Sequence, residues 1–274
     1  MKIGITLWNL EAKNIVEKIE RVADMGFQSV SFLGSSFEKD KSADVARVVK
    51  ERNLTITFHL SFFGTSRKKL ISGLEYRLNS INEFIEKGGL KKNLYTIGFD
   101  PAFIEAEDKK SLIFDYEGTV LALKRSLELT DKAVKITVEN WTINAGIQNF
   151  ISIAQEIDSK RLGMLLDVGH FNISMRKNLL GLSKYEDFFE KLPLKIFELH
   201  VHDNDGDVDL HMPMGSGNTD FKGIIGAAKE AGCFDKDTVF TLEIKPKMKN
   251  LKIDLASIRK TVVENKNRLS LIIG

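Results

Sequence analysis

The sequence predicts an α/β fold, a single (β/α)₈ TIM barrel that forms one domain over residues 1–274. Three observations predict it: the length of 274 residues, a β-rich run that recurs eight times, and a helical pattern of apolar residues between successive runs. Strict strand–helix alternation is typical of a parallel sheet covered by helices. Eight such units in roughly 270 residues match one closed barrel. An open doubly wound sheet with as many strands remains the alternative.

The predicted strands are short runs rich in β-branched and aromatic residues. They cover residues 2–8, 28–33, 54–60, 94–100, 134–139, 163–167, 195–202 and 238–244. No linker rich in serine or proline and no shift in composition divides the chain. One domain is therefore the simplest prediction.

Between the strands, apolar residues recur at spacings of three and four, which places them on one face of a helix. The clearest sets are Ile15, Ile19, Val22 and Ala23; Leu70, Leu74, Leu78, Ile81 and Ile85; Ile113, Tyr116, Val120, Leu123 and Leu127; and Leu251, Leu255, Ile258 and Val262. Gly88 and Gly89 are typical of a helix end, and Thr219 and Asp220 are predicted to cap a helix that begins at Phe221.

The composition excludes several classes of protein. With 40 Lys+Arg against 38 Asp+Glu, the net charge of +2 argues against a protein that holds nucleic acid mainly through bulk charge. The single cysteine, Cys233, excludes an internal disulfide and a cysteine zinc cluster, and fits a reducing, cytoplasmic location. No apolar run approaches the roughly 18 residues that span a bilayer, so we expect no membrane partner.

Metal-ligating and acid–base side chains collect at the C-terminal ends of the predicted strands, where barrels of this kind carry their chemistry. They are His59, Glu139, Asp167, His200 and Glu243. A lone His or Asp after a strand is more often a helix cap or a loop hydrogen-bonder. Together, however, these groups would be costly to bury unless a cation binds among them. The set lacks thiolate and suits Mn²⁺, Mg²⁺, Co²⁺ or Zn²⁺ with positions open to substrate.

A second cluster follows the seventh predicted strand. Asp209 and His211 are expected to combine with His170 as a second metal site, while a solvated acidic loop is the alternative for Asp205 and Asp207. Residues 215–217, Gly-Ser-Gly, precede a predicted helix, so a phosphate cradle at that helix N-terminus is a further alternative.

Aromatic residues lie near the same predicted strand ends. Trp8, Phe62 and Trp141 are expected to contact substrate, because flat aromatic walls suit the apolar faces of a sugar ring. Phe62 and Phe63 as a pair could instead wedge into unstacked DNA.

Five segments together resemble the xylose-isomerase-like TIM-barrel superfamily, which contains sugar isomerases and epimerases together with endonuclease IV. They are TVEN (137–140), LLDVGH (165–170), LHVHD (199–203), DLHMPMGSG (209–217) and TLEIKP (241–246).

The resemblance implies that Glu139, Asp167, His200 and Glu243 form a divalent-metal site. In the isomerase and epimerase branch, Glu139 and Glu243 would move a proton through a metal-stabilised enediolate. His59 and His170 would hydrogen-bond substrate oxygens. His202 either binds substrate or replaces His200 as the metal ligand.

The resemblance also implies an alternative, an endonuclease-IV-like abasic-site endonuclease with a multi-metal site and DNA as its partner. His170, Asp209 and His211 match one additional metal position of that branch. Asp100 stands where its partner histidine for His59 is expected, and Ser216 stands where glutamate is usual. We therefore expect an isomerase or epimerase with a small-molecule sugar or sugar-phosphate substrate, compatible with a homo-oligomer. A binding or regulatory module with a vestigial site is the third hypothesis.

Overall fold

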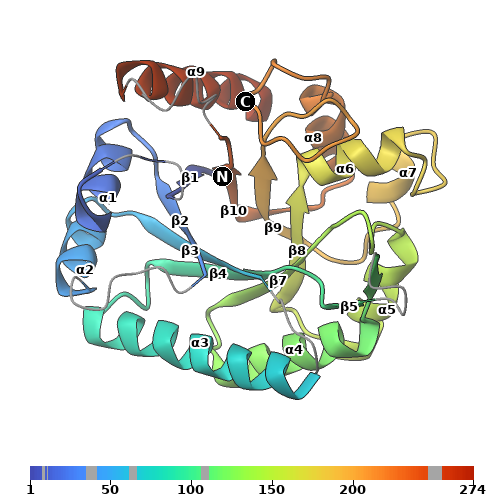
Figure 1. The fold of residues 1–274 in the computed structure, drawn as a ribbon, viewed down its shortest axis with the longest axis horizontal. Helices are drawn as coiled ribbons and strands as arrows, with labels where there is room; N and C mark the ends of the chain where they lie inside the picture. The colour runs from blue at the N-terminus through green and yellow to red at the C-terminus, as the bar shows by residue number, and fades with distance from the viewer. Residues whose placement is uncertain (8–9, 11, 35–41, 62–66, 106–110, 246–254) are drawn as a thin grey trace.

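Eight parallel strands close into a barrel surrounded by helices (Figure 1) in a computed structural model that describes residues 1–7, 10, 12–34, 42–61, 67–105, 111–245 and 255–274. Around the barrel the strand order is β1-β10-β9-β8-β7-β4-β3-β2. The closed barrel is confirmed, and the open-sheet alternative is wrong. The eight strands are β1 (Lys2–Thr6), β2 (Ser29–Leu33), β3 (Thr55–Leu60), β4 (Leu94–Phe99), β7 (Lys135–Glu139), β8 (Leu162–Asp167), β9 (Ile196–Val201) and β10 (Phe234–Leu242).

All eight strands lie where the sequence predicts them, with ends that coincide or differ by at most four residues. The largest difference is in β10, which begins at Phe234 rather than at residue 238. The pairing of β10 with β9 shifts register between Phe234 and Val239. This irregularity interrupts the alternation of side chains along β10, so the sequence pattern indicates only the part of the strand that follows it.

Nine helices are assigned in the described part of the chain. They are α1 (Ile15–Asp24), α2 (Ser42–Glu51), α3 (Arg67–Gly88), α4 (Tyr116–Leu129), α5 (Ile147–Ile157), α6 (Val168–Arg176), α7 (Glu186–Phe189), α8 (Phe221–Glu230) and α9 (Leu255–Ile273). None of these described helices is long and apolar enough to cross a bilayer.

Local sequence signals explain several helix ends. Asn14 caps α1 by accepting from the backbone N–H of Glu17, and Asp220 caps α8 by accepting from that of Gly223. The α3 helix ends at Gly88, and Gly89 follows with φ of +61°, a left-handed conformation that glycine adopts without steric cost.

The fourth predicted helix is wrong at its start. Ile113 lies in β6 (Leu112–Phe114), which pairs with β5 (Phe103–Glu105) as a separate antiparallel hairpin, and α4 begins only at Tyr116. Ile113 is three residues before Tyr116, so its spacing fits the helical pattern by coincidence. Asp115 lies between them and caps α4 by accepting from the N–H of Gly118, which sets the boundary.

The interior of the barrel is unusually polar. Apolar strand residues such as Phe58, Ile97 and Leu199 are fully buried in the core. The hydroxyls of Thr57, Thr96 and Thr241, from three different strands, converge instead on the carboxylate of Glu198 inside the barrel. Large branched apolar side chains usually fill this space in such barrels. A cluster of charged groups at the C-terminal ends of the strands lies next to this polar interior, since Glu198 Oε1 is 3.8 Å from His200 Nε2.

Candidate active site

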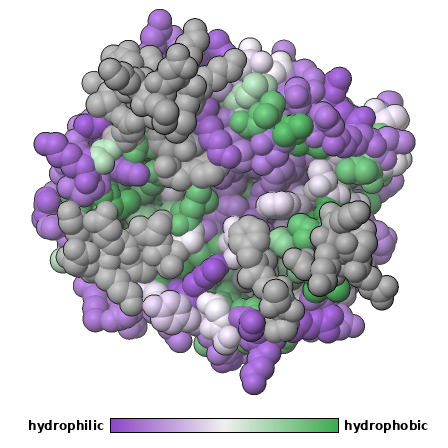
Figure 2. Space-filling model, viewed as in Figure 1, coloured by the Kyte–Doolittle hydropathy of each residue, from purple (hydrophilic) through white to green (hydrophobic). Residues whose placement is uncertain are grey.

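The predicted histidines and carboxylates meet at the C-terminal end of the barrel. In the view of Figure 2, hydrophilic residues lie near the centre of the molecule, where Figure 1 shows the barrel strands. The site residues His59, Glu139, Asp167, His200 and Glu243 are all buried, each with less than a tenth of its surface exposed. Side chains from β3, β7, β8, β9 and the end of β10 therefore form one cluster.

His59, at the end of β3, contacts two carboxylates through one ring nitrogen. Its Nε2 is 2.7 Å from Asp100 Oδ1 and 2.8 Å from Glu139 Oε2. Burial lowers the pKa of His59, but these two carboxylates together raise it well above its usual range. Burial alone would raise the pKa of Asp100, but the neighbouring imidazole of His59 has the larger effect and lowers this pKa to about 2. His59 is therefore held as a charged hydrogen-bond donor.

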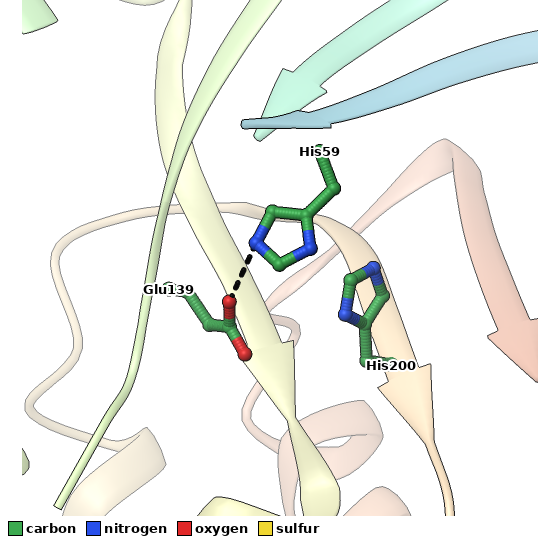
Figure 3. Close-up of side chains that lie close together, drawn as sticks. All are labelled: His59, Glu139 and His200. Atoms are coloured by element: carbon green, nitrogen blue, oxygen red, sulfur yellow. Dashed lines mark ion pairs between the residues drawn. The ribbon is translucent and has the colours of Figure 1, made fainter. Parts of the chain in front are cut away.

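His200 lies next to His59 in the cluster. Figure 3 shows its ring beside that of His59, with Glu139 paired to His59 by the dashed contact. The two imidazole rings have centroids 4.8 Å apart. His200 Nδ1 lies 2.9 Å from Glu243 Oε2. Burial lowers the pKa of His200, but Glu243 and Glu198 raise it to about 10.

Asp167 ends β8 and performs two structural tasks. Its Oδ1 accepts from the backbone N–H of His170 and so caps α6. The same carboxylate lies 3.0 and 3.1 Å from His202 Nε2. Asn140 fixes the backbone of Asp167 through two hydrogen bonds. Asn140 Nδ2 donates to the carbonyl oxygen of Asp167, and the backbone N–H of Asp167 donates to Asn140 Oδ1.

Several sets of these side chains could hold a cation. The ligand atoms of Asp167, His200 and Glu243 lie within 4.8 Å of one another, as do those of Glu139, Asp167 and His170. Three buried atoms, Glu139 Oε2 and both ring nitrogens of His200, face oppositely charged groups at ion-pair distance but make no well-directed hydrogen bond with a described residue. Unsatisfied buried carboxylate and imidazole atoms are costly, and a divalent ion that prefers O and N ligands would satisfy them.

A second cluster surrounds Asp209. His211 Nε2 lies 2.9 Å from Asp209 Oδ2, and His170 Nε2 lies 3.5 Å from the same oxygen. The opposite nitrogen of each ring faces a backbone carbonyl, that of Asn140 for His170 and that of Glu243 for His211. Because a carbonyl only accepts, Nδ1 carries the proton in both rings and Nε2 points to Asp209. The structure thus brings together the three residues that the sequence predicts as a second metal site.

His202 belongs to this second cluster. Its ring stacks on that of His211 with centroids 4.1 Å apart, and its Nε2 lies 3.6 Å from Asp209 Oδ1. Burial raises the pKa of Asp209, but His170 and His211 hold it well below its usual range.

The alternative of a phosphate cradle at residues 215–217 is contradicted by the hydrogen bonds of this loop. The backbone N–H groups of Gly215, Gly217 and Thr219 all donate to the carboxylate of Asp203. An internal anion therefore takes the donors that a phosphate would need, and Asp203 fixes this loop. The predicted cap at Thr219 is also replaced, since Asp220 alone supplies the side-chain cap of α8.

The predicted aromatic contacts are described only in part. Trp8, Phe62 and Phe63 lie outside the described residues. Trp141 is half-buried, and its ring lies 5.0 Å from that of His170 and 6.4 Å from that of Phe103, between centroids. Trp141 therefore borders the second cluster.

Sequence reasoning missed two buried carboxylates, Glu198 as a member of the barrel interior and Asp100 as the partner of His59. For Glu198 a signal was present. It lies two residues before His200 in an otherwise apolar strand, so both side chains point to the same face.

Comparisons with known proteins agree with this architecture. The protein MJ1311 of Methanocaldococcus jannaschii, described as uncharacterized, is 22% identical over 255 residues, which are 89% of this chain and 84% of that protein. A D-tagatose 3-epimerase-like protein has a similar crystal structure, with a TM-score of 0.74 and 20% identity over 100% of this chain and 97% of that one. The 3-keto-D-glucoside 4-epimerase YcjR of E. coli has a TM-score of 0.69 and 18% identity over 97% of this chain and 99% of that one.

At these identities the two structures show a shared fold. The sequence profile of the xylose isomerase-like TIM barrel family matches residues 19–261, which include the ends of all eight barrel strands except that of β1. The chain belongs to the xylose isomerase-like TIM barrel family.

Proposed function

We propose that this protein is a divalent-metal-dependent sugar or sugar-phosphate isomerase or epimerase that moves a proton between carbon atoms or between the two faces of one carbon. The observation that carries the proposal is the pair of buried glutamates, Glu139 and Glu243, which end β7 and follow β10 within one cluster of histidines. The epimerase names of two structures with the same fold support it.

The two glutamates are suited to act as bases. Burial raises the pKa of each, but His59 for Glu139 and His200 for Glu243 lower it below its usual value. Both carboxylates are therefore ionised at neutral pH. The carboxylate that removes a proton from a substrate carbon would then hold that proton and could return it, whereas the other carboxylate would have to take up a proton before it could deliver one to the opposite face.

The remaining residues would bind and orient the substrate. His59, charged and fixed by Asp100, is suited to donate a hydrogen bond to a substrate oxygen. His170 and Trp141 border the same space, with their rings 5.0 Å apart. We propose Glu139, Asp167, His200 and Glu243 as the metal ligands. A divalent ion held by them would stabilise the negative charge that develops on the substrate when its proton leaves.

Isotope exchange tests this function. Incubation in D₂O with Mn²⁺ and a panel of ketoses that includes D-tagatose is expected to introduce deuterium into a C–H bond of one of them. Glu139→Gln and Glu243→Gln are each expected to slow the exchange by about 10²–10⁴-fold. Glu156→Gln on the surface of α5 is the control and is expected to exchange like the wild type. Exchange retained in both site variants contradicts the two-glutamate mechanism.

A second candidate function is supported by the Asp209 cluster. Two adjacent cation sites would suit hydrolysis of a phosphodiester at an abasic site in DNA. Incubation with a duplex that contains one abasic site tests it, and the absence of cleavage with Mn²⁺, Zn²⁺, Mg²⁺ and Co²⁺ would eliminate it. Against it stands Asp100, a carboxylate partner for His59 where that activity leads us to expect a histidine.

A further inference from the structure

Glu198 is a fully buried carboxylate inside the barrel, below the proposed metal site. It lies on β9 two residues before His200, so the two side chains share the inner face of the strand. A buried carboxylate is costly unless it is hydrogen-bonded or paired. The contacts that stabilise it therefore indicate what it does.

Three hydroxyls fix the carboxylate in one orientation. Thr57 Oγ1 and Thr241 Oγ1 donate to Glu198 Oε1 over 2.8 Å each, and Thr96 Oγ1 donates to Oε2 over 2.5 Å. A threonine hydroxyl has one proton to donate, so each of these contacts uses the full donor capacity of its residue. The threonines come from β3, β4 and β10, and Glu198 is thereby attached to both sides of the barrel.

The fourth contact of Glu198 is with His200. His200 Nε2 lies 3.8 Å from Glu198 Oε1, at ion-pair distance, whereas His200 Nδ1 lies 2.9 Å from Glu243 Oε2. The two nitrogens of one imidazole therefore face two different carboxylates, one in the barrel interior and one in the site.

We infer that Glu198, held by its three threonines, is a positioning residue whose fixed carboxylate faces Nε2 of His200 and keeps the ring oriented so that Nδ1 faces the site. Histidines that bind metals commonly donate their other N–H to a carboxylate, which fixes the tautomer and the ring. The role of Nδ1 as a metal ligand rests on the proposed function. The restraint that Glu198 places on the ring through Nε2 is independent of that function.

Three variants separate this role from simple packing. Glu198→Gln removes the carboxylate charge and retains the shape. Thr241→Val removes one donor to Glu198 and leaves the carboxylate in place. Thr137→Val is the matched control, because Thr137 is also buried and also two residues before a site glutamate, but its hydroxyl has no hydrogen-bond partner among the described residues.

Two measurements are made on each variant. The first is the dissociation constant for Mn²⁺, measured by calorimetry. We expect Glu198→Gln to weaken Mn²⁺ binding by about 10–100-fold, Thr241→Val to weaken it several-fold, and Thr137→Val to change it by less than about twofold. The second is the Nε2–H signal of His200 in ¹H–¹⁵N spectra of the metal-free protein, assigned with His200→Asn. It is expected to be protected from exchange in the wild type and in Thr137→Val, and shifted or lost in the other two variants.

The two measurements distinguish failure of this inference from failure of the proposed function. A wild type that binds no Mn²⁺ contradicts the metal-dependent function, and the Nε2–H signal alone then decides the role of Glu198. If the wild type binds Mn²⁺ and both Glu198→Gln and Thr241→Val bind it with the wild-type affinity, the inference is wrong. It is also wrong if both of these variants show the wild-type Nε2–H signal. If Glu198→Gln does not fold, Thr241→Val decides by the same criteria.

Discussion

His59 and Asp100 form a buried pair in which His59 Nε2 lies 2.7 Å from Asp100 Oδ1. Asp100 follows β4 directly, so the ends of two adjacent strands are joined across the rim of the barrel. The same nitrogen lies 2.8 Å from Glu139 Oε2, so Asp100 shares the charge of this imidazole with the proposed catalytic base.

Asp100→Asn is expected to destabilise the protein by about 1.5–3 kcal/mol, because a buried hydrogen bond between charged groups is weakened while its histidine stays buried. Urea denaturation at pH 7 measures the change. Asp44→Asn, at an exposed position in α2, is the control and should stay within about 0.5 kcal/mol of the wild type. A loss for Asp100→Asn no larger than that of the control would show that the pair contributes nothing to stability.

Binding of a divalent ion is expected to stabilise the fold, because the carboxylates of Glu139, Asp167 and Glu243 are buried close together. An ion at 100 times its dissociation constant adds about 2.7 kcal/mol. Thermal unfolding with Mn²⁺ and with EDTA measures the shift in Tm. Asp167→Asn, which can still cap α6, is expected to reduce the shift, and the surface variant Glu156→Gln to preserve it. An identical Tm with Mn²⁺ and EDTA in the wild type would contradict a metal site here.

The sequence predicted the scaffold well because period and residue type determine it locally. Each strand is an apolar run between turn signals, and each strand end that carries His59, Glu139, Asp167 or His200 lies within two residues of its predicted position. Ile113 shows the limit of this reasoning, since one apolar residue at helical spacing cannot show that a hairpin and a cap at Asp115 precede the helix.

Partners across the barrel were not predictable in the same way. Asp203 accepts from Gly215 and Gly217, and the glycine pattern alone does not show whether an internal carboxylate or a bound phosphate receives those N–H groups. Glu198 likewise bonds to threonines on other strands, so its role depends on barrel closure, which places residues far apart in the chain in contact.

The Asp209 cluster is expected to hold a second ion, because both Nε2 atoms of His170 and His211 face one carboxylate while their Nδ1 atoms face backbone carbonyls. Elemental analysis after dialysis with Mn²⁺ should give two ions per chain in the wild type and one in Asp209→Asn. Asp205→Asn, in the exposed part of the same loop, is the control with two. A wild type with one ion would instead assign His170 and His211 to substrate binding.

Gly163→Ala is expected to destabilise the barrel by about 1–3 kcal/mol through overpacking. A Cβ at this position would lie 2.2 Å from the ring of Phe197 and 2.6 Å from the backbone oxygen of Lys195, which cannot move without shifting β9. In Gly226→Ala, on α8, the new Cβ meets no atom within 4 Å, and helix propensity favours alanine. Urea midpoints compare the two variants, and equal midpoints would contradict close packing at Gly163.

The pairing of Asp115 with Arg67 is expected to make stability depend on pH in the acid range. Asp115 Oδ1 lies 2.8 Å from an Arg67 guanidinium nitrogen and also caps α4. Burial raises the pKa of Asp115, but Arg67 and the N–H of Gly118 lower it below the usual 3.8. Because Asp115 binds a proton less readily in the folded state than in the unfolded chain, the stabilisation from its charge is complete above the pKa that Asp115 has in the unfolded chain. It is lost as the pH falls through the lower folded value.

Asp115→Asn retains a capping oxygen and removes the charge. Arg67 is half-exposed, so solvent screens the pair, and we expect the wild type to be more stable than the variant by about 0.5–1 kcal/mol at pH 7. Urea denaturation between pH 2.5 and 7 should show this difference shrinking below about pH 4, where protonation of Asp115 removes the same charge. Arg67→Gln should remove most of the pH-dependent part, because the carboxylate then loses its main ionic partner. A difference that stays constant over the whole range, or that survives Arg67→Gln unchanged, would show that the cap and not the ion pair is responsible.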